Sequence, residues 1–524
     1  MRRHGSFLLR RRMKSQRGPL SFLTARVIEV KYAGLSILQE KRLPKCDTLI
    51  RNAQILDGSG GEPRPGSVAI DGDSIAGIGD LSDDGARNIV DGEGKILAPG
   101  FIDAHTHDDL YVIRAPEMVP KLSQGVTTVI VGNCGISAAP VQLLGNPPEP
   151  MNLLGEANAF HYPKFGDYVK AIASARPAVN VAALVGHTSL RNNHLDRLDR
   201  TATADEIAAM RAQLCESLEQ GALGLSTGLA YSSANSASTE EVSSLCEPLF
   251  DARAIYTAHL RTESNLILDA LKEAFHIGQI ARVPVIISHL KCAGHDNWGR
   301  SGEVLQSLEK AANGHSIGWD CYPYAASSTI LSLCQVDERI AITITWSTPH
   351  PEVTGKTLAR IAASWGTTQI EAARRLQPAG AIYYCMSEDD VQRILGHPGT
   401  MIGSDGLPND PFPHPRLWGT FPRVLAYYCR EQKLFSLAEA VRKMTSLTAQ
   451  RFGLAHRGWI REGYAADLVL FDAETVRDTA NFEDPIKPAS GINAVWVNGE
   501  LSYWKQTRTG QRAGRFLRRQ NKPS

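Results

Sequence analysis

Short apolar runs and amphipathic stretches alternate along most of the chain. Runs of apolar and β-branched residues are typical of buried strands, and apolar residues every three or four positions are typical of helices. The segment after residue 202 illustrates the helical pattern, because Thr203 and Glu206 form a capping-box sequence, apolar residues follow at helical spacing and Gly221 provides a stop. We therefore expect a helix here, followed by a strand at Ala222–Ser226.

The alternation continues towards the C-terminus. A second helix is expected to open at Ser238–Glu241 and to be kinked or shortened by Pro248, and a third is expected at about Asn265–Ile280. Strands that alternate with helices build a parallel sheet. The eight candidate strands are Phe101–Ala104, Thr127–Val131, Val181–Val185, Ala222–Ser226, Ile255–Ala258, Val285–Ser288, Ile317–Asp320 and Met401–Ser404. Eight is the number of a TIM-type (β/α)8 barrel, so the predicted fold class is α/β with such a barrel.

Both ends of the chain carry another pattern, in which short β runs are separated by turn residues. Near the N-terminus the runs are Asp47–Ile50, Ser67–Ile70 and Ser74–Ile78, and near the C-terminus they are Asp467–Phe471 and Ala494–Val497. On this pattern we expect residues 46–97 and 456–505 to pair as one small β-sandwich domain.

The barrel is expected to span residues 98–455, with one long insertion. The interval between the seventh and eighth candidate strands contains Thr343–Gly366 and further helical sequence. A segment of this length is usually functional, so we expect residues of about 330–395 to form a lid over the site. Residues 506–524 are expected to be a basic C-terminal tail.

Composition limits the class of partner. The chain has 524 residues, of which 43% are hydrophobic, enough to bury a barrel-sized core and a smaller domain. Its 56 Lys and Arg residues balance 55 Asp and Glu residues, so no overall charge draws it to nucleic acid or to an anionic membrane. We expect a small-molecule partner, and the sequence indicates no oligomeric state.

The cysteines and the N-terminal segment give information about the cellular compartment of the protein. Nine scattered cysteines do not suggest a disulfide framework, and no apolar run approaches the roughly 20 residues of a membrane span, which together favour the cytoplasm. Residues 1–45 hold 12 Lys or Arg against two Glu and are expected to be a disordered basic extension. A targeting peptide and a misassigned upstream start both stay open for this segment.

Polar side chains that can bind a metal follow five of the candidate strands. They are His105, His107, Cys134, His259, His289 and Asp405. Barrel enzymes place their catalytic groups at the carboxyl ends of the strands, so these six groups are expected to meet at one rim. Taken singly, each has another interpretation: a cysteine packed in the core, a histidine satisfied in the core, or an Asp-Gly turn at Asp405.

Thiolate and imidazole ligands point to zinc. A zinc ion with one open position lowers the pKa of bound water to about 7. Asp405 would then take the proton of the water and could protonate a leaving amine, as amide cleavage requires.

The chain resembles the N-acyl-D-amino-acid deacylases, or D-aminoacylases, of the amidohydrolase superfamily over residues 46–505. The segments that carry this resemblance are Gly100–Asp108, with its His-Thr-His sequence, Gly132–Gly135, Gly186–Arg191, Gly221–Tyr231 and His414–Arg423. The resemblance implies zinc-dependent hydrolysis of N-acyl-D-amino acids to a D-amino acid and a carboxylate. Nothing in the sequence apart from the resemblance indicates D rather than L substrates.

The resemblance also implies a role for each residue. Cys134, His259 and His289 would hold one tightly bound zinc ion, and His105 and His107 would form a second, weaker site. Asp405 would be the catalytic aspartate. The residues that match the substrate-binding positions are Tyr231, Lys291, Tyr322, Ser328 and Arg416. Without the resemblance, the two cations could equally be solvated surface charges and the two tyrosines core aromatics.

Two other functions stay open. A cyclic-amide hydrolase such as a hydantoinase shares the barrel and the His-x-His opening, but such enzymes usually carry a carboxylated lysine on the fourth strand, and Ala222–Ser226 has no lysine. A non-catalytic scaffold that keeps the barrel usually loses ligands, whereas all five metal-binding positions and Asp405 are present here.

Overall fold

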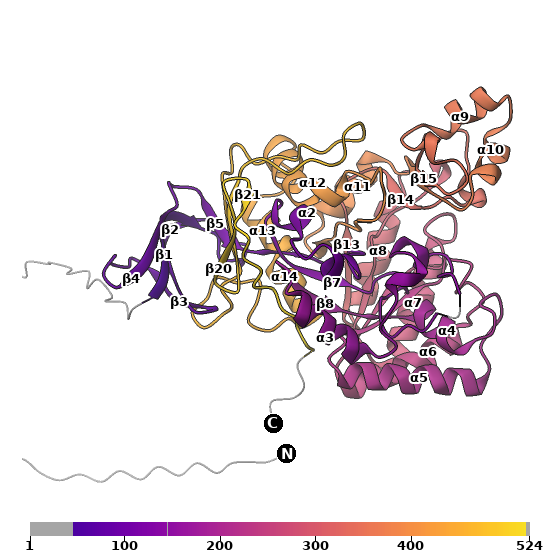
Figure 1. Ribbon diagram of the computed structural model, residues 1–524, viewed down its shortest axis with the longest axis horizontal. Coiled ribbons are helices and arrows are strands. Elements are labelled where there is room, and N and C mark those ends of the chain that lie inside the picture. The colour runs from indigo at the N-terminus through magenta and orange to yellow at the C-terminus, as the bar shows by residue number, and fades with distance from the viewer. Residues whose placement is uncertain (1–45, 144, 520–524) are drawn as a thin grey trace, which may run out of the picture. The chain divides into compact units, whose positions relative to one another are not determined.

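Eight parallel strands form the centre of the part of the chain that the computed structural model describes, residues 46–143 and 145–519 (Figure 1). They are β6 (Phe101–Asp103), β7 (Val126–Val131), β8 (Asn180–Ala183) with its continuation β9 (Val185–Gly186), β10 (Gly224–Gly228), β11 (Ile255–His259), β12 (Val285–Ile287), β13 (Ile317–Cys321) and β17 (Thr400–Ile402). The expectation for residues 1–45 lies outside the described residues.

Hydrogen bonds join these strands into a ring. One group pairs in the order β17-β13-β12-β11-β10-β9 and the other in the order β6-β7-β8, and every pair is parallel. The two groups meet because β8 and β9 are separated by a single residue, and Ala104 N, just after β6, donates to Ile402 O of β17 at 3.2 Å. The α/β class with parallel strands is confirmed, and the pairing is consistent with the predicted barrel.

Helices cover the outside of the strands, which are apolar enough to be buried throughout. All residues of β7 and of β11 are buried, as expected for a parallel sheet with both faces covered. The helices that follow the strands are α3 (Phe165–Ala175), α4 (His187–His194), α5 (Ala204–Glu219), α6 (Thr239–Ala252), α7 (Ile267–Ala281), α8 (Ser301–Ala312), α11 (Glu388–Gly396), α12 (Arg416–Arg423), α13 (Leu437–Met444) and α14 (Ser446–Phe452). Two short helices, α1 (Tyr111–Arg114) and α2 (Val119–Leu122), lie between β6 and β7.

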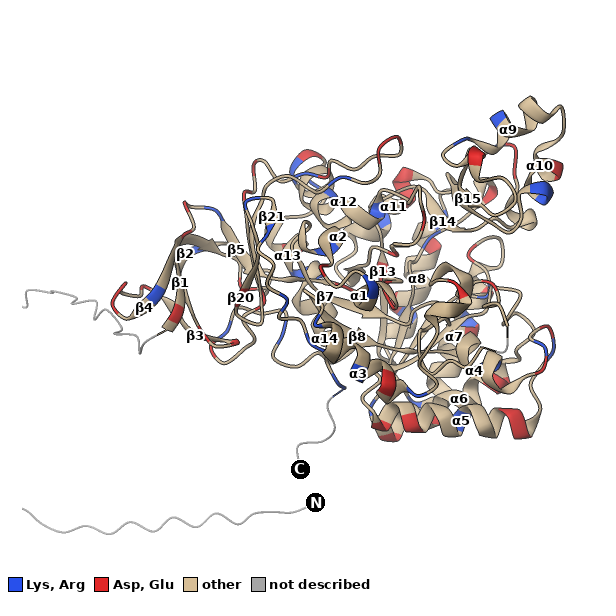
Figure 2. Ribbon diagram, viewed as in Figure 1, with Lys and Arg blue, Asp and Glu red and all other residues tan. Residues whose placement is uncertain are grey.

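The sequence predicted the helices that follow β9 and β10 well. Thr203 caps α5 with the expected capping box. α6 runs through Pro248 to Ala252, so the expectation that this proline shortens the helix was wrong, and the alternative of a kink stays a prediction. Acidic residues predominate on α5 (Figure 2). None of the described helices is both long and apolar enough to cross a membrane.

A nine-stranded sheet combines both ends of the described chain. Its strands are β1 (Cys46–Ile55), β2 (Arg64–Asp71), β3 (Ser74–Gly79), β4 (Ala86–Asp91), β5 (Ile96–Pro99), β18 (Leu468–Phe471), β19 (Ile492–Val497), β20 (Glu500–Trp504) and β21 (Thr507–Arg508). The two ends meet where β5 pairs antiparallel with β18, with Ala98 opposite Val469. The segment after β21 continues to the barrel, where Leu517 N donates to Val181 O at 2.7 Å.

Besides α11, the interval between β13 and β17 contains a three-stranded antiparallel sheet and two α-helices. They are β14 (Ser327–Ile330), β15 (Ile342–Ser347), β16 (Ala379–Tyr383), α9 (Leu358–Trp365) and α10 (Gln369–Leu376). The expectation of helical sequence from Thr343 was wrong, because Ile342–Ser347 begins with four successive β-branched residues and forms β15. The helical part starts only after Thr357, whose side chain caps α9.

Candidate metal centre

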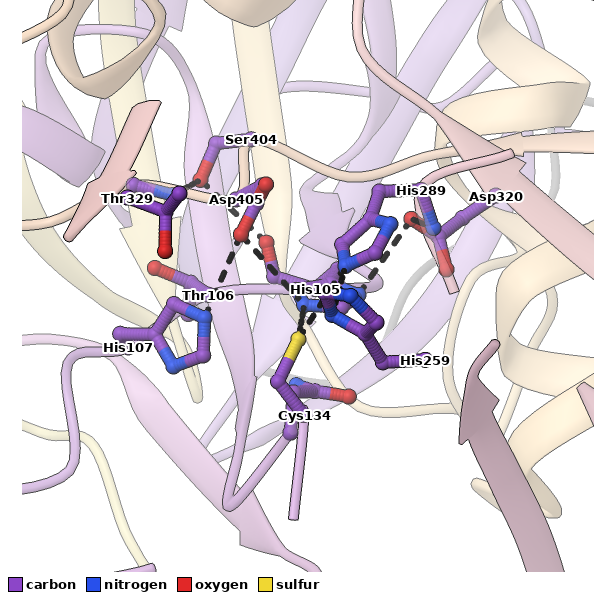
Figure 3. Close-up of polar contacts among 12 residues, drawn as sticks. His105, Thr106, His107, Cys134, His259, His289, Asp320, Thr329, Ser404 and Asp405 are labelled. Atoms are coloured by element: carbon purple, nitrogen blue, oxygen red, sulfur yellow. Dashed lines mark hydrogen bonds and ion pairs between the residues drawn. The ribbon is translucent and has the colours of Figure 1, made fainter. Parts of the chain in front are cut away.

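All six metal-binding candidates meet at the carboxyl-terminal rim of the barrel strands (Figure 3). His105 and His107 follow β6, Cys134 follows β7, and His259 is the last residue of β11. The other two, His289 and Asp405, follow β12 and β17. Every one of these side chains is at most about one tenth exposed, so the site lies within the molecule and not on a solvated surface.

The six groups lie within contact distance of one another. The Cys134 sulfur is 3.2 Å from Nε2 of His105 and 3.2 Å from Nε2 of His289. Nε2 of His289 is 2.9 Å from Nδ1 of His259. On the other side of His105, Asp405 Oδ1 lies 3.2 Å from Nε2 of His107 and 3.6 Å from Nε2 of His105.

The backbone is strained where it presents these groups. Cys134, His289 and Asp405 have φ values of 53°, 35° and 49°, in the left-handed region that residues other than glycine rarely adopt. Gly135 allows the Cys134 turn to pass close to β10, since a Cβ there would lie 2.6 Å from the Gly228 nitrogen. Strain of this kind clusters at functional sites, where the surrounding structure enforces it.

The charges at the site reinforce one another. Burial alone would raise the pKa of the Cys134 thiol, but His105 and His289 outweigh it and hold this pKa well below its usual range. Burial opposes protonation of His107 and His289, yet contacts with Asp405 for His107 and the Cys134 charge for His289 raise each pKa to about 9. Burial is likewise outweighed at Asp405, where Arg416 and His289 hold the pKa well below its usual range. The site therefore favours a thiolate and a carboxylate.

The donor set fits a metal ion. Donor atoms of His105, Cys134, His289 and Asp405 all lie within 4.8 Å of one another, and so do those of a second group formed by His259, Glu263 and His289. Thiolate and imidazole are the ligands that zinc prefers. The geometry brings both expected sets of ligands together and does not separate Cys134, His259 and His289 from His105 and His107.

A buried hydrogen-bond network beneath the metal-binding groups was not predicted from the sequence. The fully buried Lys121 donates to Asp103 Oδ2 at 2.8 Å and to Ser404 Oγ at 2.9 Å. Asp103 in turn accepts from the backbone nitrogens of Ser404, at 2.8 Å, and of His105, at 3.3 Å. This network ties the end of β6 to the end of β17 and so positions His105 next to Asp405. A buried lysine gives no sequence signal, although Asp103 lies inside the Gly100–Asp108 segment.

Two acidic residues next to the histidines were also missed. Asp320, at the end of β13, accepts a hydrogen bond from the backbone nitrogen of His289 at 3.0 Å, and its Oδ1 lies 3.5 Å from Nδ1 of His105. Glu263 lies 2.9 Å from Nδ1 of His289 and 2.5 Å from Nζ of Lys291. Carboxylates that contact the second nitrogen of a ligand histidine orient its ring. Glu263 stands in a loop without a motif, so spacing alone could not indicate it.

Four of the five expected substrate-binding residues line a cavity of about 630 Å³ that opens onto the site: Tyr231, Lys291, Tyr322 and Ser328. The hydroxyls of Tyr322 and Ser328 have no hydrogen-bond partner among the described residues, so both remain able to bind a ligand. Arg416 is 1% exposed and lies behind the cavity, where Nη1 is 2.8 Å from Asp405 Oδ2 and its guanidinium stacks 4.6 Å from the Tyr322 ring.

The barrel and the rim of histidines define the class. The amidohydrolase family matches residues 88–254 and 336–503, and the chain belongs to this family. It is 50% identical to the D-aminoacylase of Alcaligenes xylosoxydans xylosoxydans over 473 residues, which cover 90% of this chain and 98% of that protein. It is 48% identical to the N-acyl-D-aspartate deacylase of the same organism, over 90% of this chain and 95% of that protein.

Solved structures give the same relationship. The N-acyl-D-glutamate deacylase from Bordetella bronchiseptica, solved with zinc and a phosphonate inhibitor, superposes with a TM-score of 0.88 at 45% identity and covers 90% of this chain and 100% of that chain. The L-hydantoinase from Arthrobacter aurescens reaches a TM-score of 0.57 at 15% identity, over 90% of this chain and 100% of that chain, which shows the fold alone.

Proposed function

We propose that this chain is a zinc-dependent deacylase that hydrolyses the amide bond of N-acyl-D-amino acids, giving a D-amino acid and a carboxylate. The observation that carries the proposal is the meeting of Cys134, His259 and His289 with Asp405 at the floor of a cavity. The names of the relatives, which act on N-acylated D-amino acids, support the same substrate class.

Cys134, His259 and His289 would hold the tightly bound zinc ion, and His105 and His107 a weaker second one. Bound there, zinc would supply Lewis-acid chemistry for the amide carbonyl and would acidify water. The Cys134 thiolate and the imidazoles supply the donor set. Asp320 orients the His105 ring through Nδ1 and holds the His289 backbone nitrogen, and Glu263 orients the His289 ring through Nδ1.

Asp405 is the general base and acid in this proposal. Its low pKa keeps it ionised, so it can accept a proton from the water that attacks the carbonyl carbon. It then delivers this proton to the leaving nitrogen, which is a poor leaving group until it is protonated. Its contact with Arg416, at 2.8 Å, fixes the carboxylate in this orientation.

The substrate carboxylate would meet Lys291, Tyr322 and Ser328, which line the cavity on one side of the site. Tyr231 stands over His259 with ring centroids 4.9 Å apart and would close the other side. Arg416 is also assigned to the substrate in this proposal: Nη1 keeps its contact with Asp405, while Nε, which has no hydrogen-bond partner among the described residues, can donate to the substrate.

The alternatives are weaker. In the hydantoinase hypothesis a lysine on the fourth strand would be carboxylated, but β10 reads Gly-Leu-Ser-Thr-Gly from Gly224 to Gly228. A scaffold without catalysis would not need an ionised, buried carboxylate among metal ligands, which is costly to maintain without a function.

The finer architecture belongs to the same proposal. Residues 98–455 form the catalytic barrel, and 46–97 with 456–505 form a β sandwich, supported by one apolar cluster that joins strands of both ends, such as Val68 and Trp496. Residues of about 330–395 act as a lid, since Ile330, Ile340 and Tyr383 line the cavity. All nine cysteines are free thiols, which supports a reducing cytoplasm. The balanced charge supports a small-molecule partner, with neither nucleic acid nor membrane involved.

The test is a panel of N-acetyl D- and L-amino acids assayed for amine release, with zinc quantified in the same preparation. We expect turnover of D substrates and about one tightly bound zinc ion per chain. A protein that hydrolyses only L substrates, or that hydrolyses dihydrouracil or hydantoin instead, contradicts the proposal. Absence of both zinc and hydrolysis after zinc addition would favour the scaffold.

A further inference from the structure

Part of the lining of the cavity above the metal centre is apolar. Leu153, Ile330 and Leu407 form one buried cluster, against which Tyr231 packs. Leu331 and Ile340 of the inserted segment extend the same wall. A substrate bound at the metal centre through its amide and its α-carboxylate would therefore direct its side chain towards apolar groups.

The two cationic side chains, apart from histidine, that line this cavity are already neutralised. Arg261 donates from Nε and Nη2 to the two oxygens of Glu273, at 2.9 and 2.7 Å, and its other contacts go to backbone oxygens. Lys291 lies 2.5 Å from Glu263, and it is the residue that the proposed function assigns to the α-carboxylate. A second carboxylate in the substrate would find no unpaired cation among the residues that line the cavity.

The same cavity contains two acidic side chains on its outer part. Asp337 is held by Arg339, with Nη2 2.7 Å from Oδ2. The half-buried Glu149 has no ion pair or hydrogen bond from its carboxylate within residues 46–143 and 145–519, and burial raises its pKa. When ionised, Glu149 repels an anionic group that enters the cavity.

From the apolar wall, the paired cations and the unpaired Glu149 we infer that the substrates are N-acyl-D-amino acids with an uncharged, apolar side chain, and that acidic side chains are rejected. This inference rests on the proposed function, and it selects among relatives that include deacylases for D-aspartate and D-glutamate derivatives. An anion buried without a partner is unfavourable enough to set such a preference.

The direct test compares kcat/KM of the zinc-loaded enzyme for N-acetyl derivatives of D-leucine, D-methionine, D-aspartate, D-glutamate and D-lysine. We expect the apolar substrates to exceed the acidic ones by about 10²-fold, which is the lower end of the effect of an unpaired buried charge. An apolar preference below tenfold, or faster turnover of the lysine derivative, overturns the inference and leaves the proposed function standing. Failure to turn over any D substrate removes the proposed function as well.

Two substitutions test whether charge sets the preference. Glu149→Gln removes the repulsion and Gln335→Arg adds a cation at an exposed position of the cavity wall. Each should raise the ratio of acidic to apolar kcat/KM, by about tenfold for the added cation. The matched controls are Glu156→Gln, which lies outside this cavity, and Gln335→Met, which has similar length without charge; both should keep the original ratio. If neither charge variant moves the ratio beyond its control, the inference is wrong.

Discussion

Two buried groups of charged side chains lie in the same barrel but are built in opposite ways. The rim cluster consists of His105, Cys134, His289 and Asp405. The helix cluster consists of His187 and Arg191 of α4 and Glu241 of α6. Both clusters combine histidine with groups of opposite charge, and the sequence segments that contain them look equally distinctive.

The charges of the helix cluster pair with one another and with backbone oxygens, although Nδ1 of His187 has no hydrogen-bond partner among the described residues. Nη1 of Arg191 and Nε2 of His187 both reach Glu241 Oε1, at 2.5 and 2.9 Å. The other guanidinium nitrogens of Arg191 donate to the carbonyl oxygens of Ser233, Leu198 and Arg200. Its residues lie in regular helices, and none of them lines the cavity at the metal centre.

The rim cluster differs in its backbone and in its access to a cavity. Three of its four residues, Cys134, His289 and Asp405, stand on left-handed backbone, and His289 and Asp405 line the cavity of about 630 Å³. Buried charged groups that stand on strained backbone and line a cavity form a site for a ligand. Charged groups that pair with one another between helices, away from the cavity, stabilise the fold. The predictions below separate these two roles.

Cys134→Ala should have the largest effect. It removes the thiolate from the zinc ligands, so we expect loss of bound zinc together with loss of deacylase activity, while the fold is kept because the side chain is small. Zinc per chain is measured by atomic emission, activity with the D-substrate panel and folding by circular dichroism. A variant that retains full zinc and activity would contradict the assignment, and Cys246→Ala, at a buried cysteine outside the site, is the matched control.

Asp405→Asn should keep the metal and lose catalysis. The amide cannot take up a proton, so kcat should fall by ~10²–10⁴-fold, the usual contribution of a general acid and base. Zinc content should stay at the wild-type value, which distinguishes this variant from Cys134→Ala. An Asp405→Asn protein with near-normal kcat would exclude Asp405 as the group that transfers the proton.

A substitution in the helix cluster should lower the free energy of unfolding and leave zinc binding and catalysis unchanged. Arg191→Met leaves the Glu241 carboxylate buried without its guanidinium partner, which should lower the free energy of unfolding by about 3–5 kcal/mol. Zinc per folded chain and kcat should be unchanged. The control is Arg211→Met, which breaks the exposed pair with Glu247 between α5 and α6 and should cost at most about 1 kcal/mol. Urea unfolding measures both, and equal losses would refute the distinction.

The sequence predicts the rim cluster well because strand periodicity places it. Eight strand candidates fall within two residues of observed strands, and a group that follows a parallel strand necessarily lies at the carboxyl-terminal rim. The pattern does not reveal Lys121 or Glu263, because their roles depend on contacts between segments that are distant in sequence.

The limits of the prediction have the same physical origin. Arg416 lies against Asp405 and does not line the cavity, since charge in a motif does not state which neighbour it meets, and its expected contact with the substrate stays a prediction. α6 is not shortened at Pro248 because packing overrides a single proline, and Ile342–Ser347 forms a strand because a β-branched run favours one even beside helical sequence. The two-layer form of the terminal sheet stays a prediction.

The smallest effect expected is the pH dependence of the helix cluster. Burial raises the pKa of Glu241, but His187 and Arg191 outweigh it and lower this pKa from 4.5 to about 2. A carboxyl whose pKa is lower in the folded chain stabilises it fully above the unfolded value, and this contribution is lost as the pH falls from about 4.5 to about 2. The difference in unfolding free energy between the wild type and Glu241→Gln should therefore shrink over that window and stay constant from pH 6 to 8. Because zinc release at acid pH affects both proteins alike, a difference that is flat down to pH 3 would show that Glu241 is not charged in the folded chain.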